Sequence, residues 1–395
     1  MPLSPPPSRP AAAGAPAPAE RTRVLLVDDS TIYRSLVRRE LVKCADIEIV
    51  GSCGDGKAAI LAVEANQPDV VVLDIEMPVM DGLTALPKLI AARPSVKVIM
   101  ASTLTVRNAD ISMRALQMGA AETVAKPTTA KLADDAERFI EELIRKIRAL
   151  GEAARRTGAR PARRPVPARP GEEEPRVQSR PLVPAAAPAA AEIALRPAPT
   201  RAPELIAIGS STGGPKALMQ MLEVLVKSVK TPIIVTQHMP ATFTAILAEH
   251  IQRATGRKTV EATEGMAILP ERIYVAPGDY HMTVRREGRG AASLHLDQSP
   301  AENFCRPAVD PMLRSVASTY GAAAFAIILT GMGSDGAKGA KALVAAGGAV
   351  IAQDQATSVV WGMPQAAAKA GVCSAVLPLD EIAPYVSRLA MRHAA

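Results

Sequence analysis

Two stretches of the chain alternate short runs of Val, Ile and Leu with longer amphipathic segments. In the first, between Arg23 and Leu150, the runs are VLLV, IEIV, VVVL, KVIM and ETV. In the second, from Glu204 onward, they are LIAI, PIIVTQ, RIYVAP, AFAIILT and AVIAQD. Apolar runs of strand length that lack polar alternation and are separated by helical patterns are typical of parallel sheets covered on both faces. The sequence therefore predicts two doubly wound α/β domains.

A Pro-, Arg- and Ala-rich segment, residues 151–203, separates the two stretches. It holds ten arginines, no lysine, five glutamates and eleven of the 34 prolines. Because it has almost no large apolar residues, it cannot bury enough surface to fold, and we expect a disordered linker. We expect the same of the Pro/Ala-rich tail at 1–20. The predicted domains are therefore 21–150 and 204–393.

The excess of positive charge gives little support for nucleic-acid binding. The formal net charge is +7, and the linker alone contributes +5 of it. Aromatic residues make up only 3% of the chain, so the stacking platform of a single-strand binder is missing. The C-terminal half also lacks a basic recognition helix. We expect no nucleic-acid partner, although the linker arginines leave contact with acidic partners open.

The sequence predicts a cytoplasmic protein. Its four cysteines, Cys44, Cys53, Cys305 and Cys373, lie far apart without paired spacing, which argues against a zinc site or a disulfide framework and suits a reducing compartment. No apolar run approaches the roughly 20 residues that span a bilayer. The N-terminal tail lacks the charged and apolar regions of a secretion signal. We therefore expect no direct insertion into a membrane.

Three carboxylates are predicted at the carboxyl edge of the first sheet, where open parallel sheets bind ligands. Asp28 and Asp29 follow the first strand and Asp74 ends the third. Such carboxylates repel one another unless a divalent cation compensates, and their hard oxygen atoms suit Mg²⁺. Ser102 and Lys126 end the next two strands, where they could contact the oxygens of a transferred phosphoryl group. Each residue alone is more often structural, for example as a helix N-cap, so the prediction depends on their combination.

The phrases LLVDDS, VVLDIEMPVMDGL, VIMAS and VAKP resemble the receiver domain of response regulators, which has a flavodoxin-like fold. The resemblance implies that Asp74 is the phosphorylated residue and that Mg²⁺ is the cofactor. The metal ligands that it implies are Asp74 itself, Asp29 directly, Asp28 through water and the backbone carbonyl of Glu76. It also implies that Ser102 and Lys126 sense the phosphoryl group.

A glycine-rich turn, IGSSTGG, follows the first strand of the second domain. It has the form G-x-S-x-G with Ser211 at its centre, between a predicted strand and a predicted helix over Lys216 to Val226. Such a turn lifts a serine above the sheet, where the helix N-terminus favours developing negative charge. A phosphate-binding loop is less well supported, because G-x-x-x-x-G-K-[ST] is absent. A purely structural turn remains open.

A serine nucleophile needs a base, most often a histidine. His238 comes directly after the strand PIIVTQ and is predicted at the same sheet edge as the serine. His281, after a hairpin-like turn, is the rival candidate. We expect His250 on a helix face, His295 in an alternating polar strand and His393 in the C-terminal tail.

The base in turn needs a carboxylate that holds its tautomer. The strand AFAIILT runs into the glycine-rich loop Thr330 to Gly336, which places Asp335 after its carboxyl end. An N–H in this loop, such as that of Met332, could face an oxyanion. Asp279, in a Pro-Gly-Asp turn, and Asp310, in an expected loop on the substrate side, are the alternatives.

The phrases IAIGSSTGG, TQHMP, YVAPGDYHM and LTGMGSDGAKG resemble the catalytic domain of the chemotaxis protein-glutamate methylesterases, and GMP at Gly362 to Pro364 fits as well. Together with the receiver, the resemblance covers nearly the whole chain outside the tail and linker. It implies hydrolysis of glutamyl methyl esters on chemoreceptors and deamidation of receptor glutamines. Ser211 is then the nucleophile, His238 the base and Asp335 the orienting carboxylate, with the Met332 amide as an oxyanion donor. No cofactor is expected for the hydrolysis, and a histidine kinase of the chemotaxis type is the implied phosphodonor.

We expect the receiver to cover the esterase cleft until Asp74 is phosphorylated. A linker of about 50 residues tethers the receiver without positioning it rigidly. Two other functions remain open at this stage. One is a response regulator whose output domain only binds a partner, and the other is a serine hydrolase that acts on small esters or amides.

Overall fold

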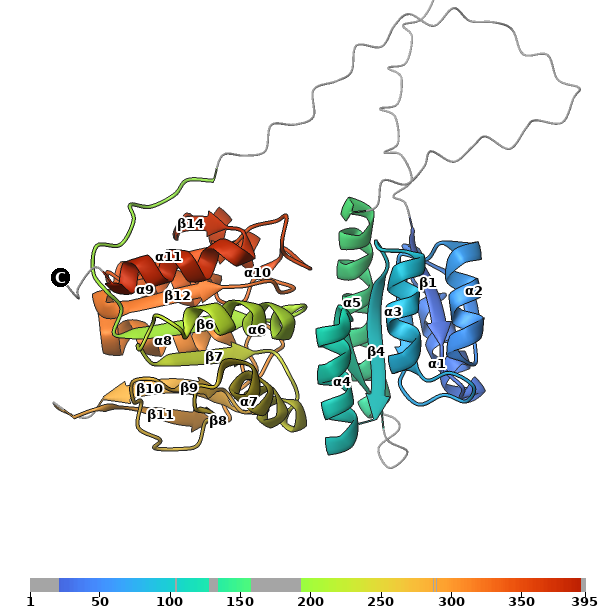
Figure 1. Ribbon diagram of the computed structural model, residues 1–395, viewed down its shortest axis with the longest axis horizontal. Helices are drawn as coiled ribbons and strands as arrows, with labels where there is room; N and C mark the ends of the chain where they lie inside the picture. Colours follow the sequence, from blue (N-terminus) through green and yellow to red (C-terminus); the bar gives the residue numbers. More distant parts are fainter. Residues whose placement is uncertain are drawn as a thin grey trace, which may run out of the picture.

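The computed structural model describes residues 21–103, 105–127, 134–157, 193–286, 288 and 290–391. These residues form two α/β domains that lie beside each other (Figure 1), as the two series of apolar runs predicted. The expected tail at 1–20 and the central part of the expected linker, 158–192, lie outside the described residues.

The first domain contains a parallel sheet of five strands in the order β2-β1-β3-β4-β5. Each predicted apolar run lies within one of its strands. The strands are β1 (Thr22–Val27), β2 (Ile47–Cys53), β3 (Val70–Asp74), β4 (Lys97–Thr103) and β5 (Glu122–Lys126). This order places a topological switch point between β1 and β3, where ligands of open sheets bind.

Helices cover both faces of this sheet. Successive side chains of β1 point to opposite faces, so the sheet has an apolar core on each side. Val24 and Leu26 belong to the first core, and Leu25 and Val27 belong to the second. The first core packs against α1 (Thr31–Leu41) and α5 (Asp134–Thr157), and the second against α2 (Gly56–Asn66), α3 (Gly82–Ala92) and α4 (Val106–Met118). The sheet is therefore buried on both sides.

The expected boundary of the first domain at Leu150 is too early. Helix α5 continues to Thr157, because Ala153 and Ala154 still pack against the domain and Arg155 donates a hydrogen bond to Thr22 Oγ1 at 2.8 Å. The linker prediction also fails at its other end. Arg196 N–H donates to Cys373 O at 2.9 Å, so this part of the chain lies along the second domain.

The second domain contains seven parallel strands in the order β14-β13-β12-β6-β7-β9-β8. In chain order they are β6 (Leu205–Ser210), β7 (Ile233–Gln237), β8 (Thr259–Glu261), β9 (Ile273–Val275), β12 (Ala324–Ile328), β13 (Ala349–Gln353) and β14 (Cys373–Leu377). The short edge strands β8 and β14 were not predicted. A separate antiparallel hairpin joins β10 (His281–Arg286) to β11 (Ala292–Asp297).

Helices cover both faces of the second sheet as well (Figure 1). On one face lie α6 (Gly214–Leu225), α7 (Ala241–Thr255) and α11 (Leu379–Met391), and on the other α8 (Val309–Tyr320), α9 (Ala337–Ala345) and α10 (Met363–Lys369). A 3-10 turn, η2 (Gly321–Ala323), leads into β12. The first strand of the domain, β6, is central, with β12 on one side and β7 on the other.

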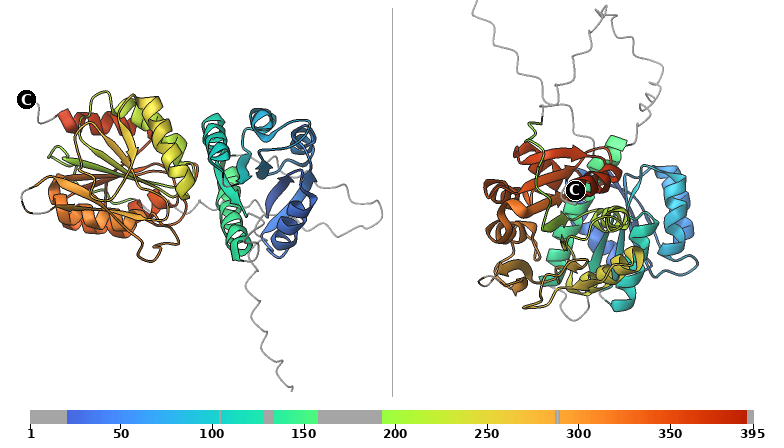
Figure 2. Two further views of the ribbon diagram at one scale, coloured as in Figure 1. Left: turned by 90° about the horizontal axis from the view of Figure 1, so that it is seen from below. Right: turned by 60° about the vertical axis from the view of Figure 1, so that its left-hand side comes forward.

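The two domains meet through helices of both. Figure 2 shows α4 and α5 of the first domain on the side that faces the second, and α4 packs against α6 and α7. Gln117 of α4 lies 3.1 Å from Met219 Sδ and 3.2 Å from His250 Nδ1. The other nitrogen of His250 lies 2.9 Å from an Asp110 carboxylate oxygen. His250 therefore lies on a helix face, as expected, and that face is a domain interface.

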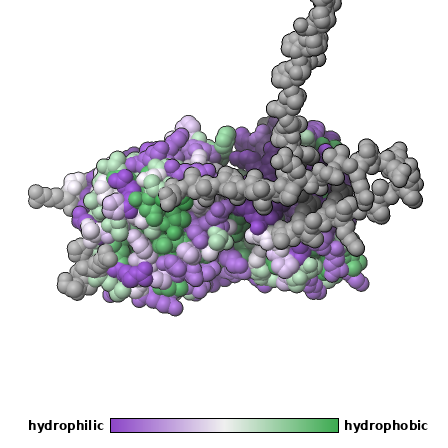
Figure 3. Space-filling view, turned by 90° about the horizontal axis from the view of Figure 1, so that it is seen from above, coloured by the Kyte–Doolittle hydropathy of each residue, from purple (hydrophilic) through white to green (hydrophobic). Residues whose placement is uncertain are grey.

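Polar side chains are spread over both domains on the face that Figure 3 shows. Among the described residues, no helix combines the length and the apolar character needed to cross a membrane.

Candidate active site

Three strand ends meet at the switch point of the second sheet. Ser211 directly follows β6, His238 directly follows β7, and Asp335 lies in the loop that leads from β12 to α9. Because β6 pairs in parallel with both β7 and β12, all three side chains reach the same sheet edge. They line one cavity of about 420 Å³.

Ser211 lies at a sharp turn between β6 and α6. Its N–H donates to Thr330 O at 3.0 Å, and Gly214 N–H donates to its carbonyl at 2.7 Å. A Cβ on Gly331 would lie 2.9 Å from Ser211 Cβ and 2.4 Å from Met363 Sδ, so only glycine lets this loop approach the serine. The turn therefore fixes Ser211 against the loop that carries Asp335.

His238 and Asp335 are in direct contact at this edge of the sheet. His238 Nε2 lies 2.8 Å from Asp335 Oδ2, and both side chains are almost fully buried. Since a carboxylate only accepts hydrogen bonds, Nε2 carries the proton, and Nδ1 of the neutral imidazole keeps its lone pair. Nδ1 is thus the nitrogen that can act as a base.

Asp335 is surrounded by hydrogen-bond donors. It accepts from Val309 N–H at 2.6 Å, Asp310 N–H at 3.0 Å, Gly336 N–H at 2.9 Å and Asn303 Nδ2 at 2.8 Å. The first two donors belong to the N-terminal turn of α8, where the helix dipole favours negative charge. Burial by itself raises the pKa of Asp335, but these donors and His238 outweigh it, so the pKa lies below its ordinary value. The carboxylate is therefore ionised.

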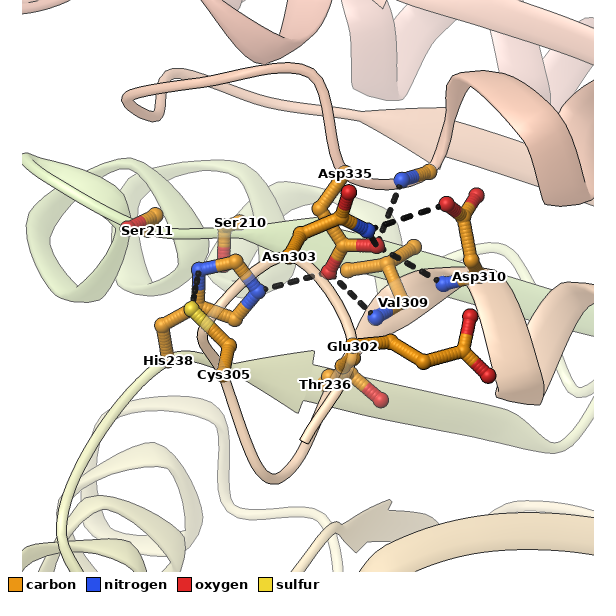
Figure 4. A network of polar contacts seen from close by, with 12 residues as sticks. Ser210, Ser211, Thr236, His238, Glu302, Asn303, Cys305, Val309, Asp310 and Asp335 are labelled. Atoms are coloured by element: carbon orange, nitrogen blue, oxygen red, sulfur yellow. Dashed lines mark hydrogen bonds and ion pairs between the residues drawn. The ribbon is translucent and has the colours of Figure 1, made fainter. Parts of the chain in front are cut away.

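Cys305, rather than Ser211, contacts the basic nitrogen of His238. Figure 4 shows the Cys305 sulfur beside the ring and Ser211 apart from it, and Sγ lies 3.3 Å from Nδ1. Within the described part of the chain, no hydrogen bond joins Ser211 to His238. Burial by itself lowers the pKa of His238, but the Cys305 sulfur and the Asp335 carboxylate raise it above its ordinary value. This contact was not predictable from the sequence, because Cys305 is distant from His238 in the chain and was not part of a predicted site.

One tight turn, Glu302 to Cys305, brings both Asn303 and Cys305 into the site. Glu302 and Cys305 exchange two backbone hydrogen bonds, at 3.1 and 2.9 Å. Between them Asn303 (φ 53°) and Phe304 (φ 64°) are both in the left-handed region, which is strained for residues with side chains. Sequence analysis missed Asn303 as well as Cys305; the strained turn is a structural signal without a sequence motif.

The rival histidines have other partners. His281 begins β10 and is fully buried, with Nδ1 3.2 Å from Ala308 N and Nε2 3.2 Å from Pro300 O. His295 lies in the predicted strand, now β11, and pairs with Glu264. His393 lies outside the described residues. None of the described rivals lines the cavity of Ser211.

The rival aspartates are also engaged elsewhere. Asp279 lies in a left-handed turn (φ 66°) and pairs with Arg306 at 2.6 Å. The expected loop position of Asp310 is wrong, because Asp310 lies in the first turn of α8 and is buried. Its carboxylate accepts from Gly339 N–H at 2.6 Å, which joins α8 to α9.

Two further residues that line the cavity have backbone N–H groups that donate no hydrogen bond to another described residue. Met332 lies in the glycine-rich loop, and Thr212 directly follows Ser211. The N–H of the residue after a nucleophile is a frequent oxyanion donor. Sequence analysis named Met332 but not Thr212.

The first domain carries a carboxylate cluster at its own switch point. One oxygen from each of Asp28, Asp29 and Asp74 lies within 4.8 Å of the others. Lys126 Nζ lies 2.6 Å from Asp28 and 2.7 Å from Asp74. Burial raises the pKa of Asp74, Lys126 lowers it and Asp28 raises it again, with a result of about 6. This set of hard oxygen donors fits a divalent cation such as Mg²⁺.

The structure also locates Glu76 and Ser102, the other residues predicted for this site. Glu76 is exposed and lines, with Asp29, a cavity of about 570 Å³. The Ser102 hydroxyl is buried and lies 3.1 Å from Ser112 Oγ. In this structure Ser102 therefore contacts α4 rather than Asp74.

Residues of the first domain also line the cavity of the second. They are Glu122, Thr123, Ala125, Glu142, Arg145 and Lys146, from β5 and α5. Arg145 lies over the Phe304 ring, 5.7 Å from its centre. The first domain thus forms one wall of the cavity that contains Ser211 and His238.

Comparisons with known proteins cover both domains. Residues 24–136 match the response regulator receiver domain, and residues 206–386 match the family described as CheB methylesterase. The chain is 55% identical to the protein-glutamate methylesterase/protein-glutamine glutaminase 1 of Paramagnetospirillum magneticum, over 95% of this chain and 98% of that protein. It is 52% identical to the corresponding protein of Azospirillum brasilense, over 99% and 98%. The solved catalytic domain of Thermotoga maritima CheB methylesterase is 40% identical and covers 48% of this chain, with a TM-score of 0.46.

Proposed function

Because this chain belongs to the family of protein-glutamate methylesterase/protein-glutamine glutaminases with an N-terminal receiver domain, we propose that Ser211, His238 and Asp335 carry out its hydrolysis reaction. The observation that carries this proposal is the contact of His238 with Asp335 at a switch point where Ser211 lines the same cavity. The domains in this proposal are a receiver at 21–157 and a catalytic domain at 193–391.

The reaction proceeds through an acylated serine. Ser211 Oγ attacks the ester carbonyl of a glutamyl methyl ester while His238 Nδ1 accepts its proton. The imidazolium then protonates the methoxide oxygen as the C–O bond breaks, and methanol leaves. Water, activated by the same nitrogen, hydrolyses the glutamyl-enzyme. In the deamidation of a glutamine the leaving group is ammonia and the steps are otherwise the same.

Asp335 and the backbone amides support this reaction electrostatically. The carboxylate holds the Nε2–H tautomer and stabilises the imidazolium, and the amides around it keep it ionised. The N–H groups of Met332 and Thr212 are the proposed donors to the oxyanion. A donor of this kind contributes roughly 3 to 4 kcal/mol to transition-state stabilisation.

The nucleophile must still reach the base. Cys305 occupies Nδ1 in this structure, and the receiver forms a wall of the cavity. A movement of the Ser211 or His238 side chain, together with withdrawal of the receiver, would complete the triad. Phosphorylation of Asp74 is the proposed trigger, because it changes the charge at a site beside β5, and β5 also lines the cavity.

The receiver residues that would hold Mg²⁺ are Asp28, Asp29, Asp74 and the backbone carbonyl of Glu76. When bound, the cation offsets negative charge where a phosphoryl group meets the carboxylates. Lys126 holds Asp28 and Asp74 together and is placed to contact the phosphoryl oxygens. Ser102 reaches this group only after it leaves Ser112.

The proposed substrates are methyl-accepting chemoreceptors, and the proposed phosphodonor is a histidine kinase of the chemotaxis type. Removal of receptor methyl groups then serves adaptation in chemotaxis. Mass spectrometry of candidate receptors, incubated with and without this protein, tests the assignment through lost methyl groups and the conversion of Gln to Glu. A receptor that keeps its methyl groups and its glutamines in the presence of this protein would not be a substrate.

The decisive variant is Ser211→Ala. We expect methanol release from methylated receptor to fall to the level without enzyme, because the attacking oxygen is gone. Ser228→Ala is the matched control, since Ser228 is exposed, its hydroxyl donates to Ser387 of α11 and it does not line the cavity. Turnover retained by Ser211→Ala would contradict the mechanism. An output domain that only binds would release no methanol even with Ser211 in place, and its binding would persist in Ser211→Ala.

A further inference from the structure

The geometry around His238 contains a second proton donor with nucleophilic chemistry. Cys305 Sγ lies 3.3 Å from Nδ1, and the opposite nitrogen is held by Asp335 at 2.8 Å. Cysteine, histidine and aspartate thus stand in the same relation as a nucleophile, its base and the orienting carboxylate. The thiol uses the same nitrogen lone pair that Ser211 needs.

The turn that carries Cys305 holds the sulfur firmly in this place. Two backbone hydrogen bonds close the turn, which contains two residues in the left-handed region. Asn303 also donates to Asp335 at 2.8 Å and to Asp310 at 3.1 Å, and these contacts hold the turn against the site. Cys305 is only partly buried and lines the same cavity of about 420 Å³ as Ser211. A small solute that enters this cavity meets the sulfur and the serine together.

We propose that Cys305 is a modification site, reactive toward peroxides and small electrophiles, and that its modification stops hydrolysis at Ser211. His238 Nδ1 accepts the thiol proton and leaves a thiolate, which is the reactive form of cysteine. The sulfur that contacts the base is the one that reacts. The reactivity of Cys305 rests on the proposed role of His238 alone, whereas the loss of hydrolysis rests on the proposed function of Ser211 as well.

The oxidation step is balanced by the peroxide itself. The thiolate attacks one oxygen of hydrogen peroxide, the O–O bond breaks, and a sulfenic acid and hydroxide form. Sulfur loses two electrons and the peroxide gains them. The hydroxide takes the proton from the His238 imidazolium and becomes water. Two equivalents of an added thiol reverse the change and yield Cys305, a disulfide and water.

The modified sulfur blocks the base. A sulfenic hydroxyl on Cys305 lies beside Nδ1 and donates to it, so the lone pair cannot accept the Ser211 proton. A carbamidomethyl group from iodoacetamide fills the same space and excludes the ester. Both modifications therefore stop hydrolysis, one by blocking His238 Nδ1 and the other by filling the cavity.

The other cysteines supply internal controls. Burial raises the pKa of the Cys53 thiol and raises that of Cys373 to about 12, which lowers their reactivity at neutral pH. Cys44 is half-buried and its sulfur lies 4.0 Å from the Glu40 carbonyl oxygen, which offers no base. Preferential reaction at Cys305 is therefore attributable to its surroundings.

The first test measures alkylation of the full-length chain by iodoacetamide near neutral pH, followed by peptide mass spectrometry. We expect Cys305 to react about tenfold faster than Cys44 and Cys53, since His238 Nδ1 lies 3.3 Å from its sulfur and is placed to accept the thiol proton during attack. In His238→Gln this advantage should disappear, whereas in Ser211→Ala it should persist. Equal rates for the three cysteines, or an advantage that survives His238→Gln, would overturn the proposal.

The second test measures methanol release after treatment with hydrogen peroxide, with each variant normalised to its own untreated rate. The unmodified chain and Cys53→Ser should lose most activity and recover it with dithiothreitol. Cys305→Ser should keep most of its own rate. An equal loss in Cys305→Ser, or full activity with Cys305 oxidised, would sink the proposal. If Cys305→Ser is too slow to assay, the alkylation rates still decide, and they do not require Ser211 to be the nucleophile.

Discussion

Asp74 in the receiver and Asp335 in the catalytic domain occupy equivalent places in their sheets. Asp74 ends β3 and Asp335 lies in the loop after β12, so both are at the carboxyl edge of a parallel sheet. Both are buried, and both are expected to act in the ionised form. Their pKa values nevertheless move in opposite directions. Burial raises the pKa of Asp74 to about 6, whereas the pKa of Asp335 lies below its ordinary value.

The surroundings of the two carboxylates explain this difference. Asp74 accepts from one backbone N–H, that of Ile75, and shares Lys126 with the carboxylate of Asp28. Asp335 accepts from three backbone N–H groups, Asn303 and His238. The carboxylate proposed to gain a phosphoryl group therefore has few hydrogen-bond donors around it, and the one proposed to orient a histidine has many. The fold places each carboxylate at the edge of its sheet, and the hydrogen-bond donors around the carboxylate determine what it can do there.

The largest expected effect on activity comes from replacing Asp335, the carboxylate with more hydrogen-bond donors. Asp335→Asn should lower kcat for methanol release by about 10⁴-fold, because the amide does not hold the required tautomer of His238 or stabilise its charged form. Steady-state assays with methylated receptor measure the loss. Phosphorylation of Asp74 by a small phosphodonor should be unchanged in this variant. A loss in both reactions would mean that the two sites are not separate.

The second-largest effect is expected from replacing Asp74, and it concerns stimulation by a phosphodonor. Asp74→Asn should leave the basal rate in place and remove the stimulation by a small phosphodonor, which we expect to be about tenfold for a typical coupling energy. Rates with and without phosphodonor, for this variant and the unmodified chain, give the comparison. Equal stimulation in both proteins would refute the switch at Asp74.

Removal of one donor to Asp335 should have an intermediate effect. Asn303→Ala leaves part of a buried carboxylate without a partner, which costs about 1 to 3 kcal/mol. We expect kcat to fall roughly tenfold and the midpoint of thermal unfolding to decrease. Asn303→Asp should be worse than Asn303→Ala, since it adds a like charge beside Asp335 and Asp310. Equal effects of the two substitutions would show that the amide only fills space.

The smallest effect is a titration. In the metal-free receiver, Asp74 should titrate with a midpoint of about 6, measured by carbon NMR of its carboxyl group. Because this pKa is raised in the folded state, the group's contribution to stability is full below its unfolded pKa of about 4 and is lost as pH rises through about 6. Added Mg²⁺ should lower the midpoint, since a cation favours the ionised form. A midpoint near 4 without metal would contradict the comparison.

Much of this arrangement was predictable from the chain itself. The apolar runs predicted ten of the strands, and the rule that parallel strands end at one edge placed Ser211, His238 and Asp335 together. The same rule gathered Asp28, Asp29 and Asp74. Except for Asp335, which lies in the loop after β12, these residues end strands or follow them within two residues, so their position depends mainly on strand direction and order.

Other features were not predictable, for a physical reason that is the same in each case. The end of α5 at Thr157 depends on alanines that bury against a neighbouring element, and composition alone suggested a linker there. Asn303 and Cys305 come from a loop whose strained turn is stabilised by contacts with α8 and Asp335. Such contacts join residues far apart in the sequence.

The amino-acid sequence by itself determined the two parallel sheets and the side chains at the carboxyl edge of each, because the apolar runs that mark the strands are a local property of the chain. Only the tertiary structure decided which group contacts the basic nitrogen of His238, how many donors surround each carboxylate, and that the receiver forms a wall of the catalytic cavity. Those outcomes depend on packing between distant segments, where differences of an ångström select one partner over another.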